Sequence, residues 1–118
     1  MHATLEPSVL NDPVLSIVRE KLRAHYGKRL EGALLFGSRA RGDHRADSDY
    51  DIAVMLSNYD YTMDEVLHLA ELSWEIQKTS GSIVSFKPVP PRDQWRDTPF
   101  SNEIARDGLA LSTPIKNA

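Results

Sequence analysis

The sequence of 118 residues has no cysteine and no long apolar run, and each absence excludes a class of protein. Without cysteine there is no disulfide and no thiolate metal site, which is compatible with a reducing compartment. No apolar run approaches the roughly 18 to 20 residues that span a bilayer. The N-terminus, with Glu6, Pro7 and Asp12, lacks the basic and apolar pattern of a signal peptide. We therefore expect a cytoplasmic protein.

The chain also lacks the excess of positive charge that is typical of proteins that coat nucleic acid. Its net charge is -3 at pH 7, so nucleic-acid binding by this chain alone is not expected, although local basic patches occur. With 118 residues and 41% hydrophobic content, it is long enough for one core and too short for a second. The sequence predicts a single domain over residues 1–118 with one site.

Hydrophobic spacing and capping signals predict an alternation of helices and strands. Asp12-Pro13 begins a helix over 13–26, and the capping box Thr62-x-x-Glu65 begins a longer helix that ends near residue 80. Three short apolar runs predict strands, and a run before Gly108 predicts a closing helix; they cover 30–36, 50–56, 83–86 and 100–107. The expected fold class is α+β (α/β), a small mixed sheet of about three strands with helices.

A proline-rich segment follows the third predicted strand. Pro88, Pro90 and Pro91 are expected to end that strand, because proline cannot donate to a ladder. Residues 87–98 form the only linker-like stretch of the chain, and we expect them to cover one edge of the site.

The most informative pattern joins a Gly-Ser turn to two aspartates: Gly37-Ser38, ten residues, then Asp49-x-Asp51. If a strand ends at residue 36 and a short helix begins at Ser38, the N–H groups of residues 37–39 point outward at a helix N-terminus, where the dipole favours phosphate. Gly37 lets the backbone approach a ligand closely, and the Ser38 hydroxyl can donate to a phosphate oxygen. Taken alone, the turn has a simpler explanation as a strand-to-helix turn with a serine N-cap.

The two aspartates predict a cation site. Asp49 and Asp51 are two apart on a predicted strand, so both side chains leave the same face, with Cα atoms roughly 6.6 Å apart by strand rise. Aspartate is depleted in strands and an unpaired buried carboxylate is unfavourable, so the pair calls for a positive partner. Oxygen ligands beside a phosphate suit Mg²⁺. The alternative is that the aspartates are polar turn residues at a solvated strand end. The spacing of the pair from the Gly-Ser turn argues against this alternative.

Basic residues crowd the loop between the turn and the aspartates. Arg39 and Arg41 are expected to contact the triphosphate tail or an acidic partner through a bidentate fork, and His44 and Arg45 are weaker candidates. The alternative for all four is a solvated basic loop. A second basic run over 19–29 is better explained by the C-terminal end of a helix dipole than by an RNA-binding face, because no aromatic residues are interleaved with it.

The large aromatic residues are assigned mainly to packing. Trp74, on the long helix, is expected in the core. Trp95 is flanked by charged residues, so we expect it to be partly exposed and packed against its own domain, with a partner or an adenine ring as the alternative. Tyr59 and Tyr61 precede the long helix and are expected to be structural.

On the Gly37-Ser38 turn and the Asp49-x-Asp51 pair, the chain resembles the minimal nucleotidyltransferases of the DNA polymerase beta superfamily. The likeness is densest over 32–55, and the tail over 102–109 is similar to the closing helix of those proteins. The resemblance implies that Ser38 contacts the nucleotide phosphates while Asp49 and Asp51 bind Mg²⁺ and AMP passes from ATP to an acceptor. It also implies an antitoxin whose partner is an all-helical HEPN ribonuclease toxin, neutralised by transfer of AMP to a tyrosine.

The sequence departs from that family at a third carboxylate. Larger members carry it on the next strand, where this chain offers Ser85, which cannot act as a general base at neutral pH. Asp93, Glu75 and Glu103 are the candidates for a replacement. We expect two carboxylates to suffice at a reduced rate, because phosphoryl transfer draws mainly on positioning and electrostatics.

Three functions are therefore open. The first is a Mg²⁺-dependent adenylyltransferase that acts on a protein partner, with Ser38, Asp49 and Asp51 as its working residues. The second is a catalytically weak or inactive antitoxin that neutralises its partner by contact alone. The third is the catalytic subunit of a small-molecule nucleotidyltransferase that a second subunit completes.

Overall fold

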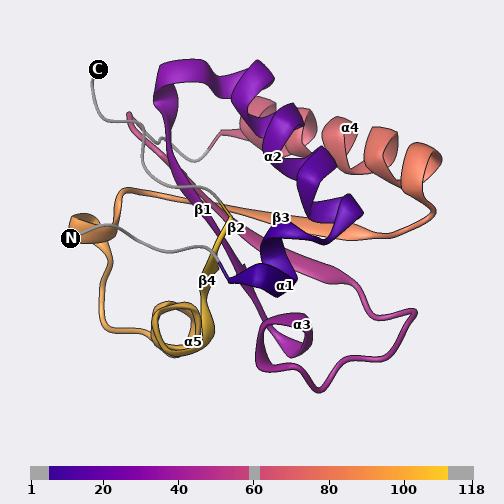
Figure 1. The fold of residues 1–118 in the computed structure, drawn as a ribbon. Helices are drawn as coiled ribbons and strands as arrows, with labels where there is room; N and C mark the ends of the chain where they lie inside the picture. The colour runs from indigo at the N-terminus through magenta and orange to yellow at the C-terminus, as the bar shows by residue number, and fades with distance from the viewer. Residues whose placement is uncertain (1–5, 59–61, 112–118) are drawn as a thin grey trace.

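A mixed four-stranded sheet forms the centre of the fold, with the strand order β3-β2-β1-β4. The structure is a computed structural model that describes residues 6–58 and 62–111. The inner strand β1 is antiparallel to both of its neighbours, β2 and β4, whereas β2 and β3 are parallel (Figure 1). The strands are β1 (Leu30–Phe36), β2 (Tyr50–Leu56), β3 (Val84–Val89) and β4 (Leu109–Ala110). The α+β class with a mixed sheet is thus confirmed.

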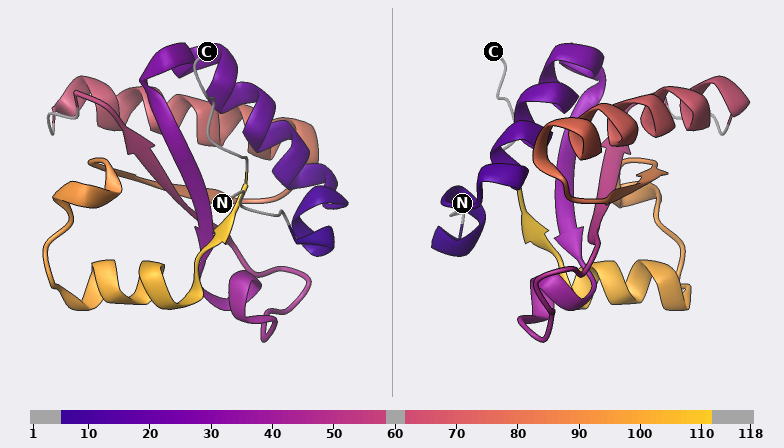
Figure 2. Two further views of the ribbon diagram at one scale, coloured as in Figure 1. Left: turned by 60° about the vertical axis from the view of Figure 1, so that its left-hand side comes forward. Right: turned by 90° about the vertical axis from the view of Figure 1, so that its right-hand side faces the viewer.

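Helices cover the two faces of the sheet unequally (Figure 2). The long helices α2 (Pro13–Tyr26) and α4 (Met63–Ser80) pack on one face and, with α1 (Pro7–Leu10), enclose the larger core. The helix α5 (Pro99–Asp107) packs on the other face over a small cluster that includes Phe36, Ala53 and Ile104. The short elements are α3 (Ser38–Arg41) and the 3-10 turns η1 (Gly27–Arg29) and η2 (Arg92–Gln94).

Alternation along β2 assigns its side chains to the two faces. Ile52, Val54 and Leu56 belong to the core beneath α2 and α4, whereas Ala53 belongs to the cluster beneath α5. Because successive residues of a strand point to opposite faces, Asp51 lies on the face of Ala53 and α5. The packing of the strand therefore determines on which side its carboxylate emerges.

The predicted starts of α2 and α4 are confirmed, although the predicted capping box at Thr62 is only half formed, because the Glu65 side chain accepts hydrogen bonds from Tyr26 and Arg29 instead. Asp12 caps α2 by accepting hydrogen bonds from the N–H groups of Val14 and Leu15, at 2.8 and 3.2 Å. Thr62 caps α4 by accepting from the N–H of Glu65 at 3.3 Å. Local capping chemistry of this kind needs no tertiary information, so the sequence is sufficient to place these helix starts.

The third predicted strand is present but ends later than predicted, and a short fourth strand joins the expected sheet of about three strands. β3 does not stop before Pro88 but continues to Val89, with Pro88 opposite Val54 of β2. β3 is an edge strand. Proline is tolerated in an edge strand where the N–H that it lacks would face away from the sheet and would have no hydrogen-bond partner. The fourth strand, β4, is two residues long and pairs with Leu34 and Leu35 of β1 after α5.

The two tryptophans behave differently from each other. Trp74 is 58% exposed, so the expectation that it lies in the core was wrong, because the core face of α4 carries Leu69, Leu72 and Ile76 instead. Trp95 packs partly buried against the cluster beneath α5 and donates its indole N–H to the carbonyl of Pro90 at 2.8 Å, as expected. Tyr59 and Tyr61 lie outside the described residues.

Candidate active site

The Gly-Ser turn lies at the end of β1, where α3 begins. Gly37 has φ 78° and ψ -157° and occupies the N-cap position, so the expectation of a serine cap does not apply. The first hydrogen bond of the helix runs from the N–H of Ala40 to the carbonyl of Gly37, at 3.1 Å. The N–H groups of Ser38 and Arg39 therefore lie in the first turn, where a helix leaves its donors to outside partners.

Asp51 lies directly against this turn. It is the second residue of β2 and pairs with Phe36 across the antiparallel ladder. A Cβ atom added to Gly37 would stand 2.5 Å from Oδ2 of Asp51, closer than real Cβ contacts come. Glycine is thus required at position 37 both by its positive φ and by the approach of the carboxylate. The structure joins the two halves of the sequence pattern in one place.

The two carboxylates repel each other. Asp49 is exposed just before β2 and Asp51 is half-buried. Burial, and next the negative charge of Asp49, raise the pKa of Asp51 above its ordinary value, while Lys87 acts in the opposite direction. Within the described residues no ion pair or side-chain hydrogen bond involves either aspartate. Two close carboxylates whose oxygens are free to accept fit a hard cation such as Mg²⁺.

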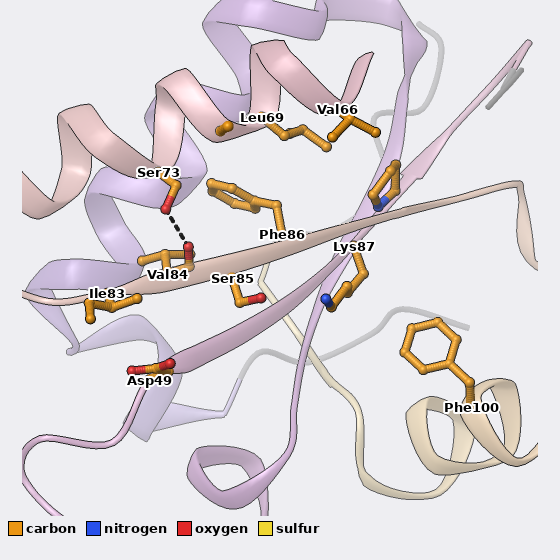
Figure 3. Close-up of a pocket in the computed structure, with 12 residues that line it drawn as sticks. Asp49, Val66, Leu69, Ser73, Ile83, Val84, Ser85, Phe86, Lys87 and Phe100 are labelled. Atoms are coloured by element: carbon orange, nitrogen blue, oxygen red, sulfur yellow. Dashed lines mark hydrogen bonds between the residues drawn. The ribbon is translucent and has the colours of Figure 1, made fainter. Parts of the chain in front are cut away.

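A pocket of about 540 Å³ opens beside Asp49, between β3 and α4 (Figure 3). Phe86 points from β3 toward α4, while Ser85 and Lys87 leave the other side of the strand. The α4 side of the pocket is apolar apart from Ser73, whose hydroxyl donates to the carbonyl of Val84, and Phe100 of α5 also lines the pocket. This combination of apolar walls and a carboxylate rim is typical of a binding site for a partly charged ligand.

Ser85 occupies the position next to Asp51. The parallel register of β2 and β3 pairs Asp51 with Ser85 and Ala53 with Lys87. The predicted alignment of Ser85 with the carboxylate strand is therefore confirmed. Lys87 was not among the predicted site residues, although its spacing of two from Ser85 places it on the same face of β3.

The three candidate replacements for the missing carboxylate differ in whether they act on Asp51. The charge of Glu103 contributes to the raised pKa of Asp51, and its Oε2 lies 3.8 Å from Nη1 of Arg41. Glu75 is instead paired with Lys21 at 3.1 Å, between the two long helices. Asp93 is exposed in η2. Of these three carboxylates, only Glu103 contributes to the shifted pKa of Asp51.

Arg39 organises the loop between the turn and the aspartates. Its Nε donates to the carbonyl of Ser48 at 2.9 Å and its Nη2 to the carbonyl of Ala46 at 3.0 Å. The guanidinium also stacks over the ring of Tyr50, 4.0 Å from the centroid. Contact of Arg39 with a triphosphate remains a prediction, and in the structure its fork holds the backbone that leads into Asp49.

Arg41 connects α3 to α5. Its guanidinium lies 3.2 Å from Asp43, 3.8 Å from Glu103 and 3.6 Å from Asp107. Exposed ion pairs contribute little to stability individually, but three carboxylates around one guanidinium fix where it lies. His44 and Arg45 are exposed on the loop.

Tyr50, between the two aspartates, points into the protein. Its hydroxyl donates to Oδ2 of Asp12 at 2.9 Å, the same side chain that caps α2. Burial, and then this hydrogen bond, raise the pKa of Tyr50 to about 12, so it stays neutral. The carboxylate strand is thus attached to the start of α2.

Comparison with known proteins gives a family and a set of similar structures. The model of the family described as "Polymerase beta, Nucleotidyltransferase" matches residues 19–95. A toxin-antitoxin crystal structure with AMP-PNP is 26% identical at a TM-score of 0.58, covering 83% of this chain and 72% of that chain. Curated proteins gave no match.

Two further solved structures support the fold alone. A putative nucleotidyltransferase from Sulfolobus solfataricus is 20% identical at a TM-score of 0.55, covering 93% of this chain and 87% of that chain. A mutant of the toxin-antitoxin MntA-HpeT is 24% identical at a TM-score of 0.56, covering 82% and 71%. Across the described residues, the structure has no helix with the length and apolar character needed to span a membrane.

Proposed function

Because the chain belongs to the polymerase beta nucleotidyltransferase family, we propose that it transfers AMP from ATP to a hydroxyl group of a protein partner. The observation that carries the proposal is the contact between the two motifs: Oδ2 of Asp51 lies 2.5 Å from the position that a Cβ of Gly37 would take. A phosphate held by the turn would then lie beside the carboxylates. The lack of cysteine is compatible with a cytoplasmic reaction of this kind.

The residues of the turn would bind the nucleotide. The N–H groups of Ser38 and Arg39, with the Ser38 hydroxyl, can donate to phosphate oxygens at the positive end of α3. Asp49 and Asp51 would hold Mg²⁺, which neutralises phosphate charge and orients the reacting oxygens when bound. Arg41 lies close enough to Glu103 and Asp107 to be held near this end of the sheet.

The reaction is a displacement at the α-phosphorus. The acceptor oxygen forms a bond to that phosphorus, the bond to the bridging oxygen of pyrophosphate breaks, and the hydroxyl proton passes to water. Ser85 offers no carboxylate for this proton. Phosphoryl transfer depends mainly on positioning and on charge stabilisation, so two carboxylates support it at a reduced rate.

The partner we propose is a helical toxin of the HEPN ribonuclease type, with a tyrosine as acceptor. Two similar solved structures are toxin-antitoxin structures, one of them with AMP-PNP. A partner chain would then supply the acceptor wall of the pocket beside Asp49.

Two other functions compete with this one. Because Ser85 stands beside Asp51 in place of an acid, the chain could neutralise its partner by binding alone, without catalysis. A small-molecule transferase completed by a second subunit is the remaining alternative, and its acceptor would occupy the same pocket.

Labelled ATP separates these functions. The chain is incubated with Mg²⁺, ATP labelled on the α-phosphate and its proposed helical toxin partner, and transfer to the toxin is measured. Asp49→Asn and Asp51→Asn should abolish labelling, whereas Asp47→Asn, an exposed aspartate in the same loop, should not. Labelling that survives the first two changes refutes the proposed metal site. Toxin inhibition that needs no ATP supports the binding function.

A further inference from the structure

A second group of metal-ligating side chains lies on the helical layer. His25 belongs to the last turn of α2, and Glu65 and His68 lie one turn apart on α4. Each side chain offers one ligand atom, and these atoms all lie within 4.8 Å of one another. We propose that these three residues bind Zn²⁺, or a transition-metal ion of similar preference, and that the ion clamps α2 to α4.

The ligand types fit such an ion. Two imidazole nitrogens and one carboxylate oxygen, with water in the fourth position, are a common set for Zn²⁺ and suit it better than Mg²⁺. Tetrahedral coordination with Zn–N bonds near 2.0 Å places ligand atoms roughly 3.4 Å apart, so the groups must close by about 1 Å. The ring centroids of His25 and His68 are already 5.1 Å apart. Both histidines are exposed, so their rings are free to make this adjustment.

Glu65 is the fixed member of the group. It is buried, and its oxygens accept hydrogen bonds from the hydroxyl of Tyr26 at 2.6 Å and from Nη2 of Arg29 at 3.1 Å. Burial acts to raise the pKa of Glu65, but the two hydrogen bonds and the charges of Arg29 and His68 together hold the pKa below its ordinary value. Glu65 is therefore an anion before any metal arrives.

The two hydrogen bonds leave Glu65 able to coordinate. An ionised carboxylate has about four lone-pair positions, of which two donors use two. Carboxylates that bind metals are typically held by hydrogen bonds of this kind, which fix the direction of the remaining lone pairs. Tyr26 and Arg29 would thus position the ligand without touching the ion.

The cluster is separate from the aspartate pair. Arg29 donates from Nε to the carbonyl of Ser57, just after β2 ends, whereas Asp51 lies at the start of that strand. Six residues of strand place the two ends roughly 20 Å apart. Asp51 also points to the face of α5, while His25 and His68 belong to the helices of the opposite face. The oxygen-only aspartate pair would prefer Mg²⁺, and the cluster with two imidazoles would prefer Zn²⁺.

Isothermal titration of the full chain with Zn²⁺, at neutral pH and without nucleotide, tests the proposal. We expect one ion per chain at the cluster. His25→Ala and His68→Ala should each weaken binding by at least about tenfold, whereas His44→Ala, which removes an exposed histidine from the active-site loop, should not. Zn²⁺ should also raise the melting temperature of the wild type, and this rise should disappear in His25→Ala and in His68→Ala. Both histidines are exposed, so neither change should disrupt the fold.

Three results would overturn the proposal. The first is binding that neither cluster histidine changes more than His44→Ala does. The second is loss of Zn²⁺ binding in Asp49→Asn with Asp51→Asn, because the ion would then occupy the aspartate pair. The third is a Co²⁺ derivative whose visible absorption shows no difference between the wild type and His68→Ala. None of these measurements depends on nucleotidyl transfer.

Discussion

Replacing Gly37 by alanine should damage both folding and nucleotidyl transfer, and more severely than the same change at Gly42. The two glycines share a positive φ, 78° and 84°. At Gly37 the new Cβ would meet Oδ2 of Asp51 at 2.5 Å, whereas at Gly42 it would meet no heavy atom within 4 Å. The comparison therefore separates backbone strain from the contact with the carboxylate.

The expected losses follow from the two conformations. Gly42, at φ 84° and ψ 9°, is left-handed, and alanine there costs about 1 kcal/mol. Gly37, at φ 78° and ψ -157°, lies in a region nearly confined to glycine, where another residue costs about 1 to 3 kcal/mol. Displacing the Asp51 side chain from its rotamer adds about 1 kcal/mol. We expect a loss of about 3 kcal/mol for Gly37→Ala, and a misplacement of about 1 Å can slow transfer about a hundredfold.

Urea unfolding gives the free energies, and transfer from labelled ATP gives the rates. A double-mutant cycle with Asp51→Ala isolates the contact, because Gly37→Ala should cost about 1 kcal/mol less once the carboxylate is gone. Equal losses at Gly37 and Gly42 would refute the reasoning. So would a loss at Gly37 that is unchanged in the Asp51→Ala background.

Three further predictions concern charge, burial and a buried hydrogen bond. Asp51→Asn should raise the free energy of unfolding at neutral pH while abolishing transfer. Because burial and Asp49 raise the pKa of Asp51 in the folded state, the stability of the wild type should fall as the pH rises from the ordinary aspartate pKa through the raised one. Urea unfolding across that pH interval should show no such fall in the variant. Trp74→Ala should lower the free energy of unfolding by at most about 1 kcal/mol, because Trp74 is exposed. Ile76→Ala should lower it by about 2 to 5 kcal/mol, because Ile76 is buried. Losses of the same size for the two variants in urea unfolding would contradict this difference in burial. Tyr26→Phe should cost about 1.5 to 3 kcal/mol by the same measurement, because it removes a donor from an ionised buried carboxylate, and an unchanged stability would exclude that role.

Features that depend on near neighbours in the chain were predictable from the sequence. The caps at Asp12 and Thr62 are local chemistry, so α2 and α4 begin where expected. The turn at Gly37 and the strand that carries Asp51 were also recognisable, because an apolar run on each side marks where a buried strand ends or begins. The contact between Gly37 and Asp51 was not predictable in this way, because it depends on the register of β1 against β2.

Features that depend on the sheet as a whole were not predictable. Pro88 reads as a strand breaker until β3 is known to be an edge strand. The pairing of Leu109 with β1 depends on where α5 returns the chain. Trp74 could have been assigned better, since it falls outside the spacing of Leu69, Leu72 and Ile76, but its size suggested a core position. Lys87 was overlooked because β3 was expected to end before it.

The attachment of Tyr50 to Asp12 makes the active site sensitive to a distant part of the chain. Tyr50, the residue between Asp49 and Asp51, is anchored to a helix cap, with Arg39 stacked on its ring. Any movement of α2 along its axis would be transmitted through that anchor to the spacing of Asp49 and Asp51.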